Sequence, residues 1–180
     1  MNNKNFQTYI DFGSSQIRAI SFDKNNHELN HQIEVDCKSN FDPKNIDLKA
    51  ASSVIEKVVL EIEKKNKEYL NDIYLMLDCP CTLPISLSVY MNNDKKKLAK
   101  EQLKYLIQDA KQKIQASYPD QEIIHIVVTN YQIDKNNYQN IPKDIIFENI
   151  SIDLLFICFP KSFVKKINDL FNSYNIKINR

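Results

Sequence analysis

Polar and apolar residues alternate along the first 37 positions, a period typical of β-strands. Residues 6–12 and 16–22 predict two strands joined by a turn at Gly13. Residues 29–37 predict a third strand, which follows the polar turn at 23–27. Because both turns are short, we expect the three strands to form an antiparallel meander.

The period changes to that of a helix after the third strand. Apolar residues recur every three or four positions from Leu48 to Ile62, which predicts an amphipathic helix. Asp47 is suited to cap its first turn, and we expect the helix to end near Tyr69. Residues 73–77 then form a short apolar run of the kind found in buried strands.

The second half of the chain combines further strands with two helices. Residues 83–91 alternate as a strand does, and the spacing of apolar residues over 98–114 predicts a helix with a lysine-rich outer face. The other expected elements are strands at 123–129, 131–134 and 146–159, a helix at 162–174 and the start of a strand at 175–179. The fold class is therefore expected to be mixed α/β.

Composition indicates a folded protein without general affinity for nucleic acid or membrane. Of the 180 residues, 43% are hydrophobic, and 24 basic residues balance 23 acidic residues to a formal net charge of +1. Residues 1–5 are polar, and no apolar stretch approaches the length of a membrane span. We therefore expect a cytoplasmic protein with no signal peptide and no direct membrane insertion.

The cysteines are too few for a disulfide framework in a chain of this size, so we expect reduced thiols. They are Cys37, Cys79, Cys81 and Cys158. The Cys79-Pro80-Cys81 sequence suggests a metal site, but a structural zinc ion needs four ligands and the other candidates are distant in sequence. The spacing favours ordinary cysteines and no metal.

Gly13 is the only glycine in the chain, and it marks the candidate functional site. A glycine kept between two apolar runs indicates either a left-handed backbone or an approach too close for a side chain. The turn Asp11-Phe12-Gly13-Ser14-Ser15 offers hydroxyls and backbone N–H groups to an anion, and Asp11 is suited to anchor a metal indirectly. The alternative is an ordinary hairpin turn.

The order of elements resembles the opening of the ATPase superfamily that includes actin and sugar kinases, where this turn is the first phosphate loop. Residues 122–127 and 131–134 resemble the stretch E-I-L-H-V-I-P-x-x-F-x-V-D of the bacterial cell-division protein family FtsA. Further segments that resemble FtsA in the same order are 45–48, 73–77, 167–170 and 175–178.

The resemblance to FtsA implies two subdomains. Residues 1–82 would be a partial actin-like subdomain 1A of the ribonuclease H type, and residues 83–180 would be the SHS2-type subdomain 1C. The resemblance also implies a vestigial phosphate loop for cofactor binding, made of Asp11, Gly13, Ser14 and Ser15.

Departures from the family pattern remove most of the expected ATP chemistry. Gln16 stands where many members carry lysine. The second phosphate loop, the adenosine-binding motif, subdomains 2A and 2B and the membrane-targeting helix have no counterpart in this sequence. Full-length members use ATP and magnesium, whereas we expect no cofactor, no catalytic residue and no enzyme activity here. A subdomain 1A that lacks its later elements would expose apolar faces of the meander and of the helix over residues 48–62. We therefore expect residues 83–180 alone to fold at least as well as the whole chain.

The leading hypothesis is a non-catalytic, FtsA-like divisome protein, placed at the division site on the inner face of the membrane when assembled. The resemblance implies self-association and recruitment of later division proteins through the SHS2 subdomain, whereas FtsZ binding belongs to the subdomains without counterpart. One alternative is a fragment of an actin-fold ATPase such as a sugar or acetate kinase. The other is a PilM-like pilus assembly protein; the match at residues 122–134 favours the division protein.

Overall fold

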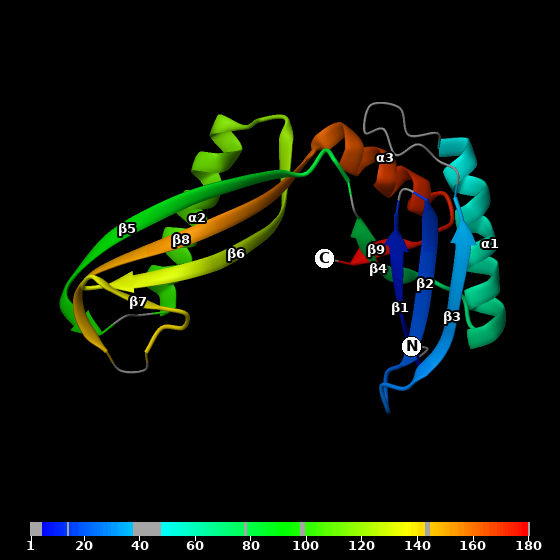
Figure 1. Cartoon of the computed structure of the whole chain (residues 1–180), viewed down its shortest axis with the longest axis horizontal. Coiled ribbons are helices and arrows are strands. Elements are labelled where there is room, and N and C mark those ends of the chain that lie inside the picture. The colour runs from blue at the N-terminus through cyan, green and yellow to red at the C-terminus, as the bar shows by residue number, and fades with distance from the viewer. Residues whose placement is uncertain are drawn as a thin grey trace. The chain divides into compact units, whose positions relative to one another are not determined.

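The computed structural model describes residues 5–13, 15–37, 48–77, 79–97, 100–142 and 145–179 (Figure 1). The expected helix cap at Asp47 and the resemblance at 45–47 lie outside these residues. The elements in chain order are β1 (Phe6–Phe12), β2 (Gln16–Asp23), β3 (Leu29–Asp36), α1 (Leu48–Asn66), β4 (Asp72–Leu77), β5 (Leu83–Lys97), α2 (Lys100–Ser117), β6 (Gln121–Ile133), β7 (Asn136–Tyr138), β8 (Ile146–Pro160), α3 (Lys161–Asn172) and β9 (Lys177–Asn179).

The mixed α/β class is confirmed, and the elements form two compact units. The first comprises Met1–Cys81 together with Ser162–Arg180, and the second comprises Thr82–Lys161. Each unit is built on one sheet. No helix among the described residues is long and apolar enough to cross a membrane.

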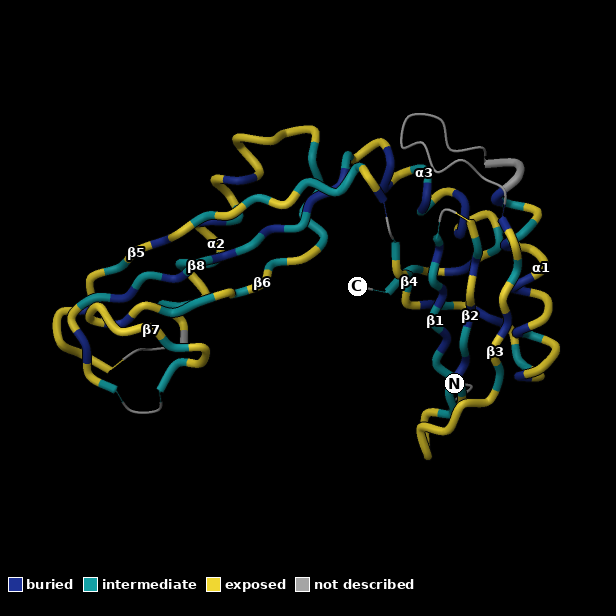
Figure 2. Tube along the Cα trace, viewed as in Figure 1, coloured by how far each residue is buried: buried dark blue, intermediate teal, exposed yellow. Residues whose placement is uncertain are grey.

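The sheet of the first unit has the strand order β3-β2-β1-β4-β9. β1, β2 and β3 pair antiparallel, so the expected meander is confirmed, and β4 pairs parallel with both β1 and β9. Alternate residues of β1 are buried, namely Thr8, Ile10 and Phe12, which gives this sheet one closely packed face (Figure 2).

Helix α1 covers part of that packed face, where it lies against β2 and β3. Its apolar stripe is at most 6% exposed at Ala51, Ile55, Val58, Val59 and Ile62. The expectation that this stripe would be exposed is therefore wrong, because the sheet it packs on is present.

The end of α1 lies three residues before the expected position near Tyr69. Lys67 takes a left-handed φ of 54°, which ends the helical path after Asn66. The backbone N–H of Leu70 then donates to the Glu63 carboxylate at 2.9 Å, so a side chain of the helix stabilises the turn that follows it.

The segment 162–180 packs with the first unit, which differs from the expected subdomain over residues 83–180. The apolar side chains of Phe163, Ile167 and Phe171 on α3 are at most 3% exposed. β9 adds the fifth strand beside β4, and the Tyr174 hydroxyl lies 2.6 Å from the Ser52 hydroxyl of α1. The expected boundary near residue 82 agrees with the structure, but the second unit ends at Lys161 because these contacts return the chain to the first.

The second unit is a four-stranded antiparallel sheet of order β5-β8-β6-β7 with α2 packed against it. The sheet face toward α2 forms the core, which includes Val89, Ile152, Leu154 and Phe156 together with Ile114 of the helix. β6 is continuous over the two strands that the sequence predicted separately.

β5 is longer than the predicted strand at residues 83–91, because it continues to Lys97. Its pairing with β8 shifts register between Asn92 and Lys96, and Asp94 and Lys95 have positive φ. The extra residues are therefore accommodated as a bulge.

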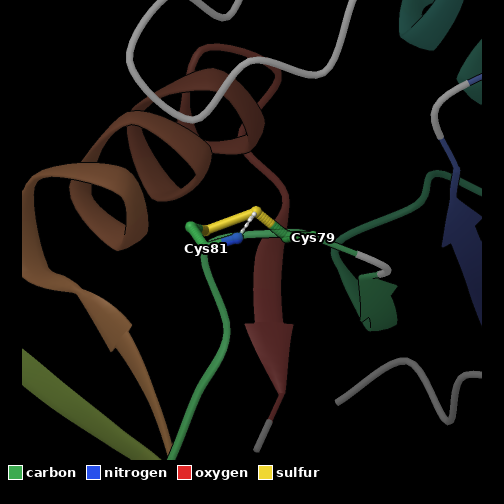
Figure 3. The surroundings of a disulfide bond; sticks show 2 residues. All are labelled: Cys79 and Cys81. Atoms are coloured by element: carbon green, nitrogen blue, oxygen red, sulfur yellow. Dashed lines mark hydrogen bonds between the residues drawn. A yellow bond between two sulfur atoms is a disulfide. The ribbon is translucent and has the colours of Figure 1, made fainter.

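A disulfide joins Cys79 and Cys81, whose Cα atoms are 5.2 Å apart (Figure 3). The expectation of four reduced thiols is wrong for this pair, because two cysteines separated by one proline come within the Cα distance that a disulfide requires. Cys37 and Cys158 are buried and outside any disulfide, and burial raises the pKa of the Cys158 thiol.

Replacing Phe171 by alanine tests the assignment of α3 to the first unit. Because this side chain is fully buried, the substitution is expected to lower the free energy of unfolding by about 3–5 kcal/mol. Hydrogen exchange should show lost protection in α1, β4 and β9. The matched variant Phe156→Ala removes an equally buried ring from the second unit and should affect β5 and β8. Loss of protection in β5 and β8 in the Phe171 variant would contradict the assignment.

Candidate functional site

The turn at Gly13 joins β1 to β2, and a short-range hydrogen bond between two of its described residues closes it. The Gly13 N–H donates to the Gln16 carbonyl oxygen at 3.0 Å. A Cβ atom at Gly13 would lie 3.0 Å from the same oxygen, closer than side chains ordinarily allow, and the glycine does not have a positive φ. Of the two reasons expected for a glycine here, close approach is therefore the one that applies.

The structure places three of the four predicted loop residues at this end of the sheet. Asp11 lies on β1 and its side chain is 34% exposed, whereas Ser15 accepts a hydrogen bond from the Cys37 N–H through its carbonyl, at 2.7 Å. Ser14 lies outside the described residues. The Gly13 N–H, which an anion would need, is already used inside the turn.

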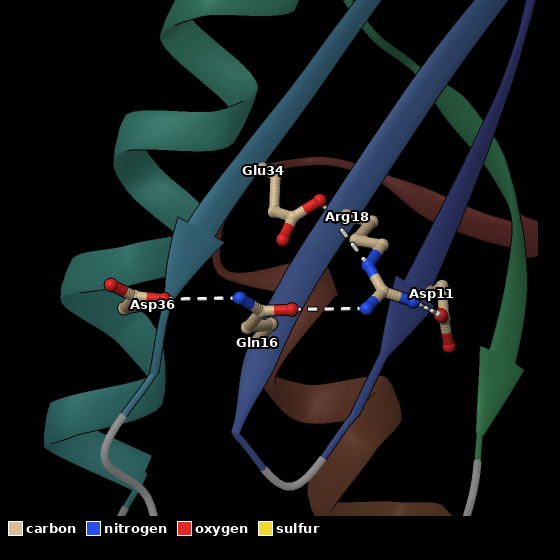
Figure 4. A network of polar contacts seen from close by, with 5 residues as sticks. All are labelled: Asp11, Gln16, Arg18, Glu34 and Asp36. Carbon is tan, nitrogen blue, oxygen red and sulfur yellow. Dashed lines mark hydrogen bonds and ion pairs between the residues drawn. The ribbon is translucent and has the colours of Figure 1, made fainter.

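Arg18 connects the side chains on the sheet beside this turn (Figure 4). Its guanidinium lies 3.7 Å from the Asp11 carboxylate and 3.4 Å from that of Glu34. It also donates to the Gln16 amide oxygen at 2.9 Å, and the Gln16 amide nitrogen donates to Asp36 at 3.2 Å. We call these five residues the Arg18 network.

The strand register creates the Arg18 network. Arg18 lies opposite Asp11 on one neighbouring strand and Glu34 on the other, and Gln16 lies opposite Asp36. A planar guanidinium with several donors suits three partners at once, whereas the ammonium of lysine is a point charge. Because Arg18 is 52% exposed, each ion pair contributes little to stability.

The network lies on the sheet face opposite the helices, since α1 and α3 both lie behind the strands in Figure 4. The network contains the carboxylates of Asp11, Glu34 and Asp36 but only one guanidinium, so it carries an excess of negative charge. In the sequence, Gln16 is recognisable only as a departure from the FtsA pattern, and the network was not predicted. The signal was present in the polar residues at alternate positions of two strands, Gln16 and Arg18 on β2 and Glu34 and Asp36 on β3.

A second polar site lies on the sheet of the second unit. A hollow of about 530 Å³ is lined by Tyr90, Gln132, Asp134, Lys135, Glu148, Asn149 and Ser151. Asp134 carries no free carboxylate here, because its oxygens accept the backbone N–H groups of Glu148 at 3.2 Å and Asn149 at 2.9 Å. This carboxylate holds the chain at the start of β8.

Asp153 lies on the same sheet and accepts two side-chain hydrogen bonds. The Ser88 hydroxyl donates at 2.5 Å and the Asn130 amide at 3.1 Å. These bonds stabilise the carboxylate, and the Ser88 hydroxyl above all lowers its pKa below the ordinary value of aspartate. Among the described residues, no group of three or more histidine, cysteine, aspartate or glutamate side chains is placed to hold a metal ion.

Comparisons with known proteins find a likeness in structure but not in sequence. No protein-family model matches the chain, and no curated protein matches it. A chain of the PilM–PilN type IV pilus biogenesis complex matches 97% of this chain at 9% identity with a TM-score of 0.60, and this chain covers 46% of it. The cytoplasmic domain of EpsL, an inner membrane component of the type II secretion system of Vibrio cholerae, matches 97% at 11% identity with a TM-score of 0.44, with 56% of its own length covered.

The PilM–PilN likeness, at 9% identity, shows a shared mixed α/β fold. The chain spans less than half the length of that neighbour. The narrower resemblance to FtsA remains a prediction.

The hydrogen bond from Ser88 makes the pKa of Asp153 testable. Because the folded-state pKa is lowered, the carboxylate contributes stability above the unfolded-state pKa and loses it as pH falls through the folded-state pKa. In Ser88→Ala the pKa of Asp153 should rise toward that of free aspartate, as measured by carboxyl-carbon NMR titration. Ser86→Ala, two residues away on β5, should leave it unchanged. An unchanged value in Ser88→Ala would contradict the role of this hydroxyl.

Proposed function

We propose that this chain is a non-catalytic protein-interaction module of an actin-like assembly factor that works at the inner face of a bacterial membrane. Two independent lines support this proposal. The sequence resembles FtsA in ordered segments along nearly the whole chain, and the structure resembles a component of a type IV pilus complex.

The closed Gly13 turn is the observation that carries the non-catalytic part of the proposal. Its glycine N–H is bonded to Gln16, and the Asp11 carboxylate faces Arg18. Hydrogen bonds to a phosphate would each add roughly 0.5–3 kcal/mol net. Association costs on the order of 4–15 kcal/mol, so one partly occupied loop does not offset it. The kinase-like alternative requires this site to bind ATP.

Division and pilus assembly are the two candidate settings. The match of residues 122–134 favours an FtsA-like role, in which the chain contacts another actin-like subunit or the cytoplasmic tail of a later division protein. The structural likeness favours a PilM-like role, since that neighbour forms a complex with PilN. In both settings the working surface binds protein.

A thermal-shift titration with Mg-ATP tests the non-catalytic proposal. We expect no saturable rise in melting temperature, because the Gly13 turn offers too few free donors. The matched variant Gly13→Ala should respond to Mg-ATP in the same way as the unaltered chain. A saturable rise that is lost in Gly13→Ala would overturn this proposal and favour the ATPase alternative.

The location of a fluorescently tagged chain in its own cells separates the two settings. An FtsA-like protein is expected to form a band at the division site of dividing cells. A PilM-like protein should instead co-localise with pilus assembly components whether or not the cell divides. Uniform fluorescence through the cytoplasm at every stage would contradict both roles.

A further inference from the structure

The sheet of the first unit carries a cluster of apolar side chains on the face opposite α1 and α3. We call it the aromatic face, and it consists of Tyr9, Ile20, Phe22, Tyr74 and Met76. The Tyr9 and Tyr74 rings stack with their centroids 5.1 Å apart, and the Tyr9 and Phe22 rings meet edge to face at 6.1 Å. Aromatic pairs in these geometries attract beyond the burial of their area.

Strand register places these residues together. Tyr9 lies opposite Ile20 on β2 and Tyr74 on β4, so the three form one row across the sheet. Their neighbours in sequence point the other way, as Ile10 and Ile73 are fully buried beneath the helices. The aromatic face is therefore the second apolar surface of a sheet whose first surface is already packed.

The aromatic face is open within its unit. Met76 is 50% exposed and Tyr74 is 37% exposed. A hollow of about 380 Å³ lies on this face, lined by Gln7, Tyr9, Ile20, Phe22, His27 and Met76. Contiguous exposed apolar groups of this kind mark interaction surfaces, and methionine with aromatic rings adapts to varied apolar partners.

The Arg18 network borders the aromatic face along one side. Asp11 lies opposite Met76, and Arg18 and Glu34 form the row next to Ile20. The network holds three carboxylates and one guanidinium, and this excess of negative charge favours a partner that brings positive charge. A second copy of the same face would instead bring its own carboxylates to the border, which disfavours symmetric self-association through it.

We infer that the aromatic face binds an amphipathic helix of a partner protein, with aliphatic side chains in its centre and lysine or arginine along the edge that meets the Arg18 network. The inference rests on the proposed function, because it names one surface of the interaction module. Helices cover sheet faces in layered α/β proteins, and three of the five residues of the aromatic face lie on the inner strands β1 and β2, away from the edges where an extended peptide would pair. The hollow accepts the largest aliphatic side chain of the helix.

A pair of designed peptides tests both the shape and the charge of this surface. Each is a fluorescein-labelled helix of about five turns with leucines at i, i+3, i+4 and i+7; one is flanked by lysines and the other by glutamates. We expect saturable binding of the lysine peptide by fluorescence anisotropy, with affinity at least about tenfold above that of the glutamate peptide. No saturable binding, or equal affinity for both peptides, would overturn the inference.

Single-residue variants test whether the lysine peptide binds at the aromatic face. Tyr74→Ser and Met76→Ser are each expected to lower the affinity for the lysine peptide about tenfold, because each removes a central apolar contact. Tyr105→Ser removes a tyrosine that is 76% exposed on α2 in the other unit, and it should not change the affinity. Glu34→Gln should lower the affinity for the lysine peptide and should not lower the affinity for the glutamate peptide.

Unchanged melting curves show that each variant is folded. A loss of binding in Tyr105→Ser equal to that in Tyr74→Ser would overturn the inference, as would concentration-dependent dimerisation that only Tyr74→Ser abolishes. The result of the peptide experiment can be distinguished from the result of the localisation experiment that tests the proposed function. A chain that binds the lysine peptide but is uniformly distributed in cells would contradict the cellular role and leave this surface intact.

Discussion

Parallel pairing of β4 with β1 on one side and β9 on the other is the constraint on which the rest of the molecule depends. A tight turn cannot join parallel neighbours, so each pair requires a long crossover. α1 lies in the first crossover, and the second contains the whole of Thr82–Lys161 followed by α3. The second unit is thus an insertion within a strand–helix–strand connection, and the first unit gains its fifth strand only after the chain returns.

The two faces of the sheet of the first unit carry different kinds of side chain. Both crossover helices pack on one face, where Ile10, Phe12 and Ile55 are fully buried. The opposite face is left to side chains that contact one another, with stacked rings in the centre and the Arg18 network at the end near Gly13. Asp11 and the Gly13 N–H, two groups of the predicted anion-binding loop, contact Arg18 and Gln16 of β2, and the apolar surface beside them is open within this unit.

Local patterns in the sequence predicted most of the elements, because strand and helix periods are set by neighbouring residues. The meander, α1 and the boundary after residue 81 follow from such patterns. The assignment of α3 and β9 did not, since their partners lie about a hundred residues earlier in the chain. Gly13 was identified as special from its isolation alone, but the reason, contact with the Gln16 carbonyl, depends on how the turn closes. The Arg18 network needed the register of three strands, and the Cys79–Cys81 bond needed the path of the backbone between them.

The strand pairing in the second unit determines which changes in sequence length the chain tolerates during evolution. Leu83, near the entry to the second unit, lies directly opposite Cys158, near its exit. The chain therefore leaves the first unit through β5 and returns to it through β8, and these two strands pair with each other. A second unit attached through two paired strands can be replaced, shortened or lengthened without altering the spacing that the first unit requires between β4 and α3. Changes in the length or sequence of Thr82–Lys161 are therefore compatible with an unchanged strand order in the first unit.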